Sequence, residues 1–362
     1  MQVGLLYGGR SAEHDVSVSS AISVHQALLE AGHQVLPIAI TLEGKWYLQT
    51  RGPGKEIQTT IPLSIRPGEG FFHNDTIVKI DAAFATTHGY GGEDGNLQGL
   101  CLLAGVPLAG CDTVSSAIGM HKDLASRLFN SHGIPTVATV VLDRYSLLQV
   151  EDYVMDQFAL LSKQLGPHLF VKPENAGSSV GVRALRNAQQ EQLVEAVRYA
   201  ALYSERVLIQ TLMEDVQEVE CAALRTKEGK LVIAGPAVVI DPAKQEQGFL
   251  SYLHKYGAND TAYLELPSTV EEETAKAIRR YARKAFLAIK ADGYSRIDFF
   301  LAKEGIFLNE INTSPGMTQT SHFPKLMGSI GYTLPDVLDH LLFDALTRAK
   351  QEQGRIYYPP TY

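Results

Sequence analysis

The sequence predicts an α/β protein made of three successive units, and three observations lead to this prediction. Over roughly the first 115 residues, apolar strand-like runs alternate with helical patterns, which is typical of a parallel sheet with crossover helices. After Gly133-Ile134-Pro135, strands instead bracket helices, as in an antiparallel sheet with helices on one side. A chain of 362 residues, 45% of them apolar, is long enough for two or three domains. We therefore predict domains at residues 1–118, 119–205 and 206–350, followed by a tail at 351–362.

Charge, hydrophobicity and cysteine content argue against a nucleic-acid-binding protein, a membrane-spanning protein and a disulfide-rich protein. The formal net charge is −8 and no basic stripe is present, which argues against a phosphate-backbone partner. The longest mostly apolar stretch, Leu100–Ala109, is far shorter than the ~20 residues that span a bilayer. The chain opens without a basic leader, and its three cysteines are too few for a disulfide framework. We expect a soluble cytoplasmic enzyme with reduced thiols that binds neither nucleic acid nor membrane.

The N-terminal unit is expected to contain three strands and one long helix. The helix has two candidate N-caps, Asp15 and Ser17, and ends at Gly32, a residue suited to a helix C-terminus. Residues 41–74 are rich in glycine and proline and predict a loop or hairpin-like insertion. The expected elements are strands at Val3–Tyr7, Gln34–Ile40 and Ile77–Ala85 and a helix at Val16–Ala31.

The later units follow a helix that is predicted over about Val114–His132. The expected elements after it are strands at Thr136–Leu142, His168–Lys172, Val180–Ala184, Val207–Thr211, Val219–Thr226 and Leu231–Ile240, and helices at Glu151–Leu165, Ala188–Tyr203, Val270–Lys290 and from Leu334 onward.

The most informative pattern is a predicted β-hairpin near the C-terminus. Two alternating runs, Arg296–Ala302 and Ile306–Asn312, are joined by Lys303-Glu304-Gly305. Side chains repeat every two residues along a strand, so pairing of Ala302 with Ile306 would fix which side chains face each other.

This register places two carboxylates, Asp298 and Glu310, opposite each other, with Arg296 opposite Asn312. Opposed carboxylates repel unless a cation lies between them. Carboxylate and amide oxygens suit Mg²⁺ held jointly with nucleotide phosphates. The alternative is a solvated face on which the arginine balances the charge.

A loop rich in glycine and serine, from Lys172 to Gly181, lies between two predicted strands. Small residues let the backbone approach phosphate oxygens, and Lys172 at a strand end can supply a positive charge. The lysine precedes the glycines and no helix follows, so this is not a Walker-type loop. The alternative is a purely structural hairpin.

Two further loops, Gly8–His14 and His88–Asn96, follow predicted strands and are expected to face one crevice. Neither has the Gly-x-Gly-x-x-Gly spacing, which argues against a nicotinamide cofactor. Glu13 could alternatively lie near the positive end of the following helix and stabilise it. The polar segment 241–260 is expected to be either a functional lid or a disordered surface loop.

Taken in order, these motifs resemble those of the D-alanine:D-alanine ligases of the ATP-grasp superfamily, over residues 3 to about 345. The resemblance is carried by Gly8–Glu13, HGYGGEDGNLQG at 88–99, Lys172–Gly181, Arg296-Ile297-Asp298 and NEINTSPGM at 309–317. It implies an ATP-grasp fold with a Rossmann-like N-terminal domain and two antiparallel α+β subdomains that enclose the nucleotide. It also implies a homodimer that makes D-alanyl-D-alanine for peptidoglycan precursors, with ATP as co-substrate and a D-alanyl phosphate intermediate.

The resemblance assigns the amino-acid substrates to five residues. Glu13 would hold the ammonium of the first D-alanine, and Ser178 and Tyr256 would join it in a hydrogen-bonded triad. Lys255 and Ser321 would bind the carboxylate of the second substrate.

The resemblance also assigns the nucleotide. Lys122 and Lys172 would bind its phosphates, with Ser179 near them, and Glu218 would accept hydrogen bonds from the ribose hydroxyls. Gln210 stands where the family commonly has an adenine-facing glutamate, so nucleotide selectivity is open at this position.

For the charged end of the site, the resemblance implies two Mg²⁺ ions held by Asp298, Glu310 and Asn312, with Glu310 bridging and Mn²⁺ as a possible substitute. Arg296 and the amide of Gly316 would form the oxyanion site, where positioning and charge stabilisation carry the reaction.

Two positions bear on the choice of acceptor. His322 replaces the usual apolar neighbour of the substrate-binding serine and could sense the charge of the second substrate. Relatives that make D-alanyl-D-lactate tend to carry phenylalanine where this chain has Tyr256, which favours D-alanine as acceptor. The alternatives are a D-alanine:D-lactate or D-alanine:D-serine ligase, and a regulatory nucleotide-binding module on an inactive scaffold.

Overall fold

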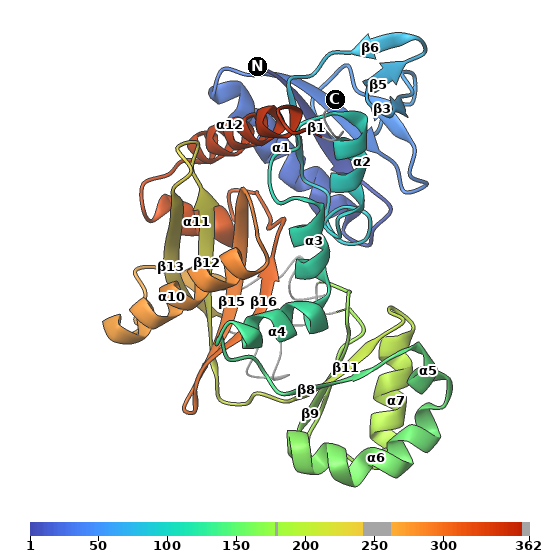
Figure 1. The fold of residues 1–362 in the computed structure, drawn as a ribbon, viewed down its shortest axis with the longest axis vertical. Helices are drawn as coiled ribbons and strands as arrows, with labels where there is room; N and C mark the ends of the chain where they lie inside the picture. Colours follow the sequence, from blue (N-terminus) through green and yellow to red (C-terminus); the bar gives the residue numbers. More distant parts are fainter. Residues whose placement is uncertain (178–179, 242–261, 357–362) are drawn as a thin grey trace, which may run out of the picture.

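The computed structural model describes residues 1–177, 180–241 and 262–356, and it contains three regions built on separate sheets (Figure 1). Figure 1 places the N-terminal region at the top, the C-terminal sheet at the left and the central region at the lower right. The Ser178–Ser179 dipeptide and the segment that contains Lys255 and Tyr256 lie outside the described residues.

The N-terminal sheet has the order β3-β2-β1-β7, and its central pairings are parallel, as predicted. Because its strands carry runs of Val, Leu, Ile and Ala that are almost fully buried, both faces need cover, which α1 and α2 help to supply. Its elements are β1 (Gln2–Gly8), α1 (His14–Glu30), β2 (Gln34–Ile40), the antiparallel edge strand β3 (Trp46–Leu48), β7 (Ala82–Ala85) and α2 (Asn96–Ala104).

Two details of this region correct the sequence-based expectations. The predicted strand Ile77–Ala85 is two strands in different sheets, because β6 (Thr76–Val78) lies at the surface, whereas β7 is buried. The residue that caps α1 is Glu13, not Asp15 or Ser17, and its side chain makes no capping hydrogen bond. The insertion at 41–74 contributes β4 (Ser64–Arg66) and β5 (Gly70–His73) to the small β4-β5-β6 sheet.

The helix predicted over Val114–His132 is also two helices, α3 (Thr113–Met120) and α4 (Lys122–Ser131). His121 between them has a non-helical backbone, with φ −86° and ψ 89°. The break lets α4 pack on the C-terminal sheet, where Ala125 and Phe129 enter its core. It also sets Lys122 at the first position of α4.

The central region is an antiparallel sheet of order β10-β9-β11-β8. Apolar side chains of α6 and α7 pack on it and close one core. A reciprocal capping box between Gln189 and Gln192 begins α7. The elements are β8 (Thr139–Leu142), α5 (Arg144–Leu148), α6 (Val150–Leu165), β9 (Leu169–Pro173), β10 (Arg183–Leu185), α7 (Gln190–Ala201) and β11 (Val207–Thr211).

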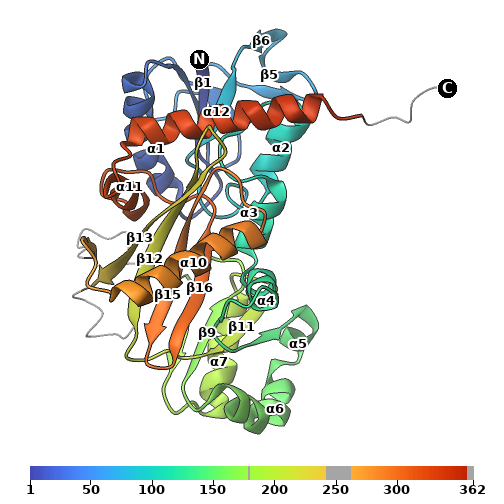
Figure 2. The same ribbon diagram turned by 60° about the vertical axis from the view of Figure 1, so that its left-hand side comes forward.

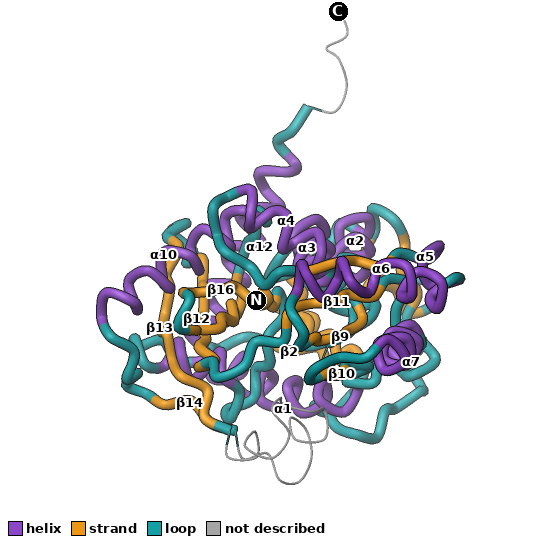
Figure 3. Tube along the Cα trace, turned by 90° about the horizontal axis from the view of Figure 1, so that it is seen from below, coloured by secondary structure: helices purple, strands orange, loops and turns teal. Residues whose placement is uncertain are grey.

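The C-terminal region is an antiparallel sheet of order β14-β13-β12-β15-β16, with α10 buried against one face. Seen from below, this sheet and the central one lie on opposite sides of the molecule (Figure 3). Its elements are β12 (Gln217–Arg225), β13 (Leu231–Ile240), β14 (Tyr263–Glu265), α10 (Glu272–Ala288), β15 (Tyr294–Ala302), β16 (Gly305–Asn312), α11 (His322–Gly328) and α12 (Leu334–Gln353).

The predicted hairpin is β15–β16, but its turn is one residue shorter than expected. Ala302 pairs with Gly305 rather than with Ile306. A β-bulge farther along shifts the register, so that Asp298 nevertheless faces Glu310, as predicted, and Arg296 faces Asn312.

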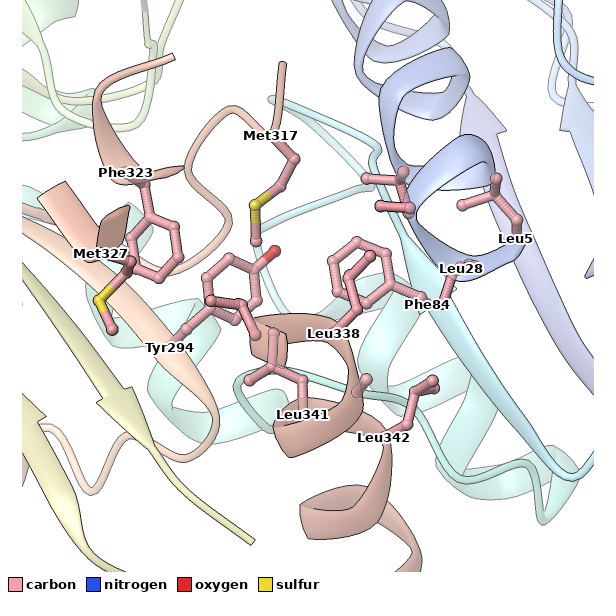
Figure 4. Close-up of a cluster of buried hydrophobic side chains, with 14 of the residues drawn as sticks. Leu5, Leu28, Phe84, Tyr294, Met317, Phe323, Met327, Leu338, Leu341 and Leu342 are labelled. Carbon is pink, nitrogen blue, oxygen red and sulfur yellow. The ribbon is translucent and has the colours of Figure 1, made fainter. Parts of the chain in front are cut away.

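The final helix, α12, returns to the N-terminal region and packs against α1 (Figure 2). A buried cluster beneath it joins elements from both ends of the chain (Figure 4). In this cluster the ring of Tyr294 lies 6.1 Å from that of Phe84 and 5.2 Å from that of Phe323, measured between centroids. These three rings sit on β15, β7 and α11, so their packing fixes the elements that surround the site.

All three cysteines are free and buried, as expected, and burial raises the thiol pKa of Cys101 and Cys111 to about 12. Over residues 1–177, 180–241 and 262–356, no helix is long and apolar enough to cross a membrane.

Candidate active site

A cavity of about 770 Å³ lies where the three regions meet. Its wall includes the first turn of α1, the loop after β7, the α3–α4 junction, strands β12, β15 and β16, and the loop that leads to α11. Nine of the predicted site residues line it: Glu13, Lys122, Glu218, Arg296, Asp298, Glu310, Asn312, Gly316 and Ser321.

One face of the C-terminal sheet supplies the acidic wall of this cavity. The strand register sets Glu220 on β12 opposite Asp298 on β15, and Asp298 opposite Glu310 on β16. Glu218 lies two residues before Glu220 and therefore shares its face. Four carboxylates thus converge on one side of the sheet, while the other side packs on α10.

Arg296 is the cation embedded in this acidic face. Its Nε and Nη2 atoms donate to the two oxygens of Asp298 at 2.8 and 2.6 Å, and Nε lies 3.4 Å from Glu220 Oε2. Burial raises the pKa of Asp298 to about 6, even though the adjacent guanidinium opposes the rise. The carboxylate charge is therefore only partly compensated by the protein itself.

Lys122, the first residue of α4, lies close to Glu310, one of the predicted metal ligands. Its Nζ donates to the carbonyl of Ala176 at 2.9 Å and lies 3.9 Å from Glu310 Oε2. It therefore joins the glycine-serine loop to the acidic face. Lys172, which precedes that loop on β9, is 7% exposed, and Gln210 on β11 donates to Thr139 Oγ1 at 2.8 Å. These two residues lie on the central sheet, outside the lining of the cavity.

Glu13 reaches the cavity between two glycine loops. A side chain at Gly89 would meet Ser11 Oγ at 2.6 Å and Glu13 Oε2 at 3.0 Å, and one at Gly177 would meet Glu13 Oε2 at 3.5 Å. Gly89 also has a φ of +69°, where L side chains are strained. Glycine at both positions lets the loops close around this carboxylate.

A buried histidine–carboxylate pair lies beside Glu13. His88 Nδ1 is 3.9 Å from Glu93 Oε2, and both side chains are almost fully buried. Burial lowers the pKa of His88, but the neighbouring Glu93 carboxylate and the charge of Glu13 outweigh this effect and raise the pKa of His88 overall. Burial and the charge of Glu13 raise the pKa of Glu93. His88 and Glu93, two groups that can exchange protons, are thus held next to Glu13.

The loop after β16 is folded tightly against the start of α11. A side chain at Gly316 would meet Ser321 Oγ at 2.8 Å, and Ser321 Oγ accepts from the amide of Thr318 at 3.1 Å. The predicted oxyanion amide and the predicted substrate-binding serine are therefore neighbours.

Sequence reasoning missed Glu220, which proves central to the site. Its side chain is 9% exposed and its Oε2 lies 2.9 Å from His322 Nδ1 as well as 3.4 Å from Arg296 Nε. A signal was present, because Glu218 and Glu220 alternate on a strand whose intervening residues are apolar.

The donor set fits a hard divalent cation by its chemistry. Carboxylates and an amide on one sheet face are oxygen ligands, and the raised pKa of Asp298 marks negative charge that a cation would stabilise. Within the described ranges, no three His, Cys, Asp or Glu side chains are arranged as a metal-binding group, and Arg296 donates two hydrogen bonds to Asp298.

Comparison with known proteins gives a consistent result. Family models described as D-ala D-ala ligase N-terminus and C-terminus match residues 2–111 and 128–343. A D-alanine–D-alanine ligase of Corynebacterium diphtheriae is 34% identical, covering 96% of this chain and 95% of the relative.

Solved structures agree with these matches. D-alanyl-alanine synthetase A from Vibrio cholerae has a TM-score of 0.81 at 31% identity, covering 96% of this chain and 98% of that one. The VanG D-Ala:D-Ser ligase from Enterococcus faecalis has a TM-score of 0.80 at 31% identity, covering 94% and 99%.

Proposed function

The chain belongs to the D-alanine–D-alanine ligase family and is a ligase of this type, and we propose that it joins two D-alanine molecules at the expense of ATP. The carboxylate of the first D-alanine attacks the terminal phosphate of ATP, the bond between that phosphate and ADP breaks, and an acyl phosphate forms while ADP leaves. The amine of the second attacks this carbonyl, and the tetrahedral intermediate collapses to dipeptide and phosphate. The product serves peptidoglycan precursor synthesis.

One observation carries the proposal: a carboxylate, Glu13, and two cations, Lys122 and Arg296, line the same cavity. Glu13 supplies a carboxylate for the ammonium of the first D-alanine. Lys122 supplies a positive charge for the phosphates, and Arg296 with the Gly316 amide can stabilise the oxyanion that develops during acyl transfer. Positioning of this kind is the main contribution that such a reaction needs from the protein.

The remaining assignments are part of the same proposal. Lys172 and Ser179 contact phosphates, Glu218 the ribose and Gln210 the adenine, while Ser178 and Tyr256 complete a triad with Glu13. Ser321 and Lys255 bind the acceptor carboxylate.

We propose that Asp298, Glu310 and Asn312 hold two Mg²⁺ ions, or Mn²⁺ in their place. When bound, these ions would neutralise charge on the transferred phosphate. Arg296 then orients Asp298 through its two hydrogen bonds and itself lines the cavity.

D-serine is an alternative acceptor, and the structural similarity to the VanG D-Ala:D-Ser ligase is the observation that raises it. A pocket that accepts a methyl group discriminates poorly against one added hydroxyl. D-lactate is the other alternative. Tyr256 argues against D-lactate, because relatives that make D-alanyl-D-lactate tend to have phenylalanine at this position.

The test is phosphate release by the purified full chain with ATP, Mg²⁺ and D-alanine alone, followed by the mass of the product. Equal concentrations of D-alanine, D-serine and D-lactate are then offered together. D-alanyl-D-alanine as the main product supports the proposal. Phosphate release that is independent of D-alanine, or a mixed product in the competition, would overturn it. Sedimentation of the same sample tests the expected homodimer, and we expect the reaction to take place in the cytoplasm, where ATP is available.

A further inference from the structure

A histidine–carboxylate pair faces the cavity on the acceptor side. His322 begins α11, next to Ser321, and its side chain is 20% exposed. Its Nδ1 lies 2.9 Å from Oε2 of Glu220, which projects from β12 and is 9% exposed. Both residues line the cavity. None of the proposed roles uses either of them.

The geometry of this pair determines which nitrogen can meet a substrate. A carboxylate only accepts hydrogen bonds, so in the neutral ring the proton resides on Nδ1. The lone pair then resides on Nε2. Among the described residues, no hydrogen bond engages Nε2. Glu220 therefore holds the ring in the tautomer whose free nitrogen can accept a proton.

The pair also lies next to the predicted oxyanion site. Glu220 Oε2 is shared, because the same atom lies 3.4 Å from Arg296 Nε. The charged groups around the ring are therefore Glu220 from β12 and Arg296 from β15, with Lys325 from α11 lining the same cavity. Ser321, the predicted ligand of the acceptor carboxylate, is the residue immediately before His322.

The proposed reaction requires a proton acceptor at this place. An amino acid enters as an ammonium, which has no lone pair and cannot attack a carbonyl. We propose that His322, positioned by Glu220, is the general base that removes one proton from the acceptor ammonium. This inference rests on the proposed function.

The step balances as follows. The ammonium gives one proton to His322 Nε2 and becomes a neutral amine. Its lone pair forms the C–N bond, and the C–O bond to phosphate then breaks with its electrons on the phosphate oxygen. The second proton lost by nitrogen leaves on that phosphate, and His322 returns its proton to solvent.

The experiment compares two nucleophiles in His322→Ala and His322→Gln. D-alanine needs the base, whereas hydroxylamine is largely unprotonated near neutral pH and traps the acyl phosphate as a hydroxamate without one. We expect kcat for dipeptide to fall by about 10²–10⁴-fold, with hydroxamate formation within about threefold of wild type. Imidazole added to His322→Ala should restore part of the dipeptide rate, and Glu220→Gln should lower the dipeptide rate less than His322→Ala does, yet more than it lowers the hydroxamate rate.

The matched control is His33→Gln. His33 Nε2 lies 2.8 Å from Asp339 Oδ1, a pair of the same kind outside the cavity lining, so its loss should leave the ratio of the two products unchanged. Equal loss of both products in His322→Gln would identify a structural role and overturn the proposal, as would full dipeptide activity. If His322→Ala does not fold, His322→Gln and Glu220→Gln decide. Failure of the proposed function is distinguishable, because wild-type protein would then release no phosphate with D-alanine.

Discussion

Replacing Arg296 with methionine should destabilise the unliganded protein and should do so more strongly as the pH rises. Methionine keeps much of the length of the side chain but removes the only cation that contacts Asp298 in the described residues. Asp298 and Glu220 would remain almost buried, at 14% and 9% exposure, without the guanidinium between them, while Glu220 keeps its contact with His322. Breaking a buried pair in this way leaves an uncompensated charge.

The magnitude follows from the geometry. Two unit charges about 4 Å apart attract by ~4 kcal/mol at an effective dielectric constant near 20. Removal of one partner of a buried pair typically costs about 3–5 kcal/mol, so we expect the free energy of unfolding to fall by that amount at pH 8. The pKa of Asp298 is already raised to about 6 by burial and would rise further without Arg296. A raised carboxyl pKa contributes stability at low pH that is lost as the pH rises through it, so the loss should shrink below pH 6.

Urea unfolding of wild type, Arg296→Met and the double variant Arg296→Met/Asp298→Asn, at pH 5 and pH 8 without nucleotide, measures this effect. The double variant should recover part of the loss at pH 8, because it no longer buries the Asp298 charge. A loss below about 1 kcal/mol, or an equal loss at both pH values, would refute the reasoning, because a solvated pair behaves in that way.

Three further predictions concern activity. Glu310→Gln should abolish phosphate release, because it removes the charge proposed to be shared by two metal ions, and near-normal release would contradict the metal assignment. Tyr256→Phe should raise the fraction of D-lactate incorporated when it competes with D-alanine, and an unchanged acceptor profile would break the link between this residue and selectivity. Gly89→Ala should lower kcat/KM for D-alanine by about tenfold or more, because the new Cβ meets Glu13 Oε2 at 3.0 Å, a displacement that misaligns the substrate. Gly91→Ala is the matched control, since its φ of +78° gives similar strain with no atom within 4 Å, and equal losses would show that strain alone matters.

Much of the fold could be predicted because periodicity and breakers are local signals. β2 at Gln34–Ile40 and β11 at Val207–Thr211 agree with the sequence to the residue. The predicted strand Ile77–Ala85 failed because an apolar run does not reveal whether its residues belong to one sheet. The predicted helix over Val114–His132 failed at His121, since nothing in its local pattern signals a break and α4 is turned there by packing on a distant sheet.

The candidate site could be predicted from the sequence only where its residues share one hairpin or one loop. Asp298 and Glu310 could be paired from a hairpin, whereas Glu220 could not, because β12 precedes β15 by some seventy residues and only the sheet order brings them together. His322 was noticed as an unusual residue, but its partner is visible only in three dimensions.

The β-bulge in β16 explains why a register derived from the wrong turn still placed the acidic residues correctly. Leu308 and Ile311 both lie in the core beneath α10, yet they are three residues apart, which strict alternation does not allow. An unbroken strand with Leu308 inward would turn Glu310 and Asn312 into that core as well. The extra residue at Asn309 reverses the alternation, so Ile311 packs inward while Glu310 and Asn312 face the cavity. The sequence contains this signal, because the two apolar positions Leu308 and Ile311 are three residues apart instead of two or four. This spacing allows one strand to contribute side chains both to the core and to the site.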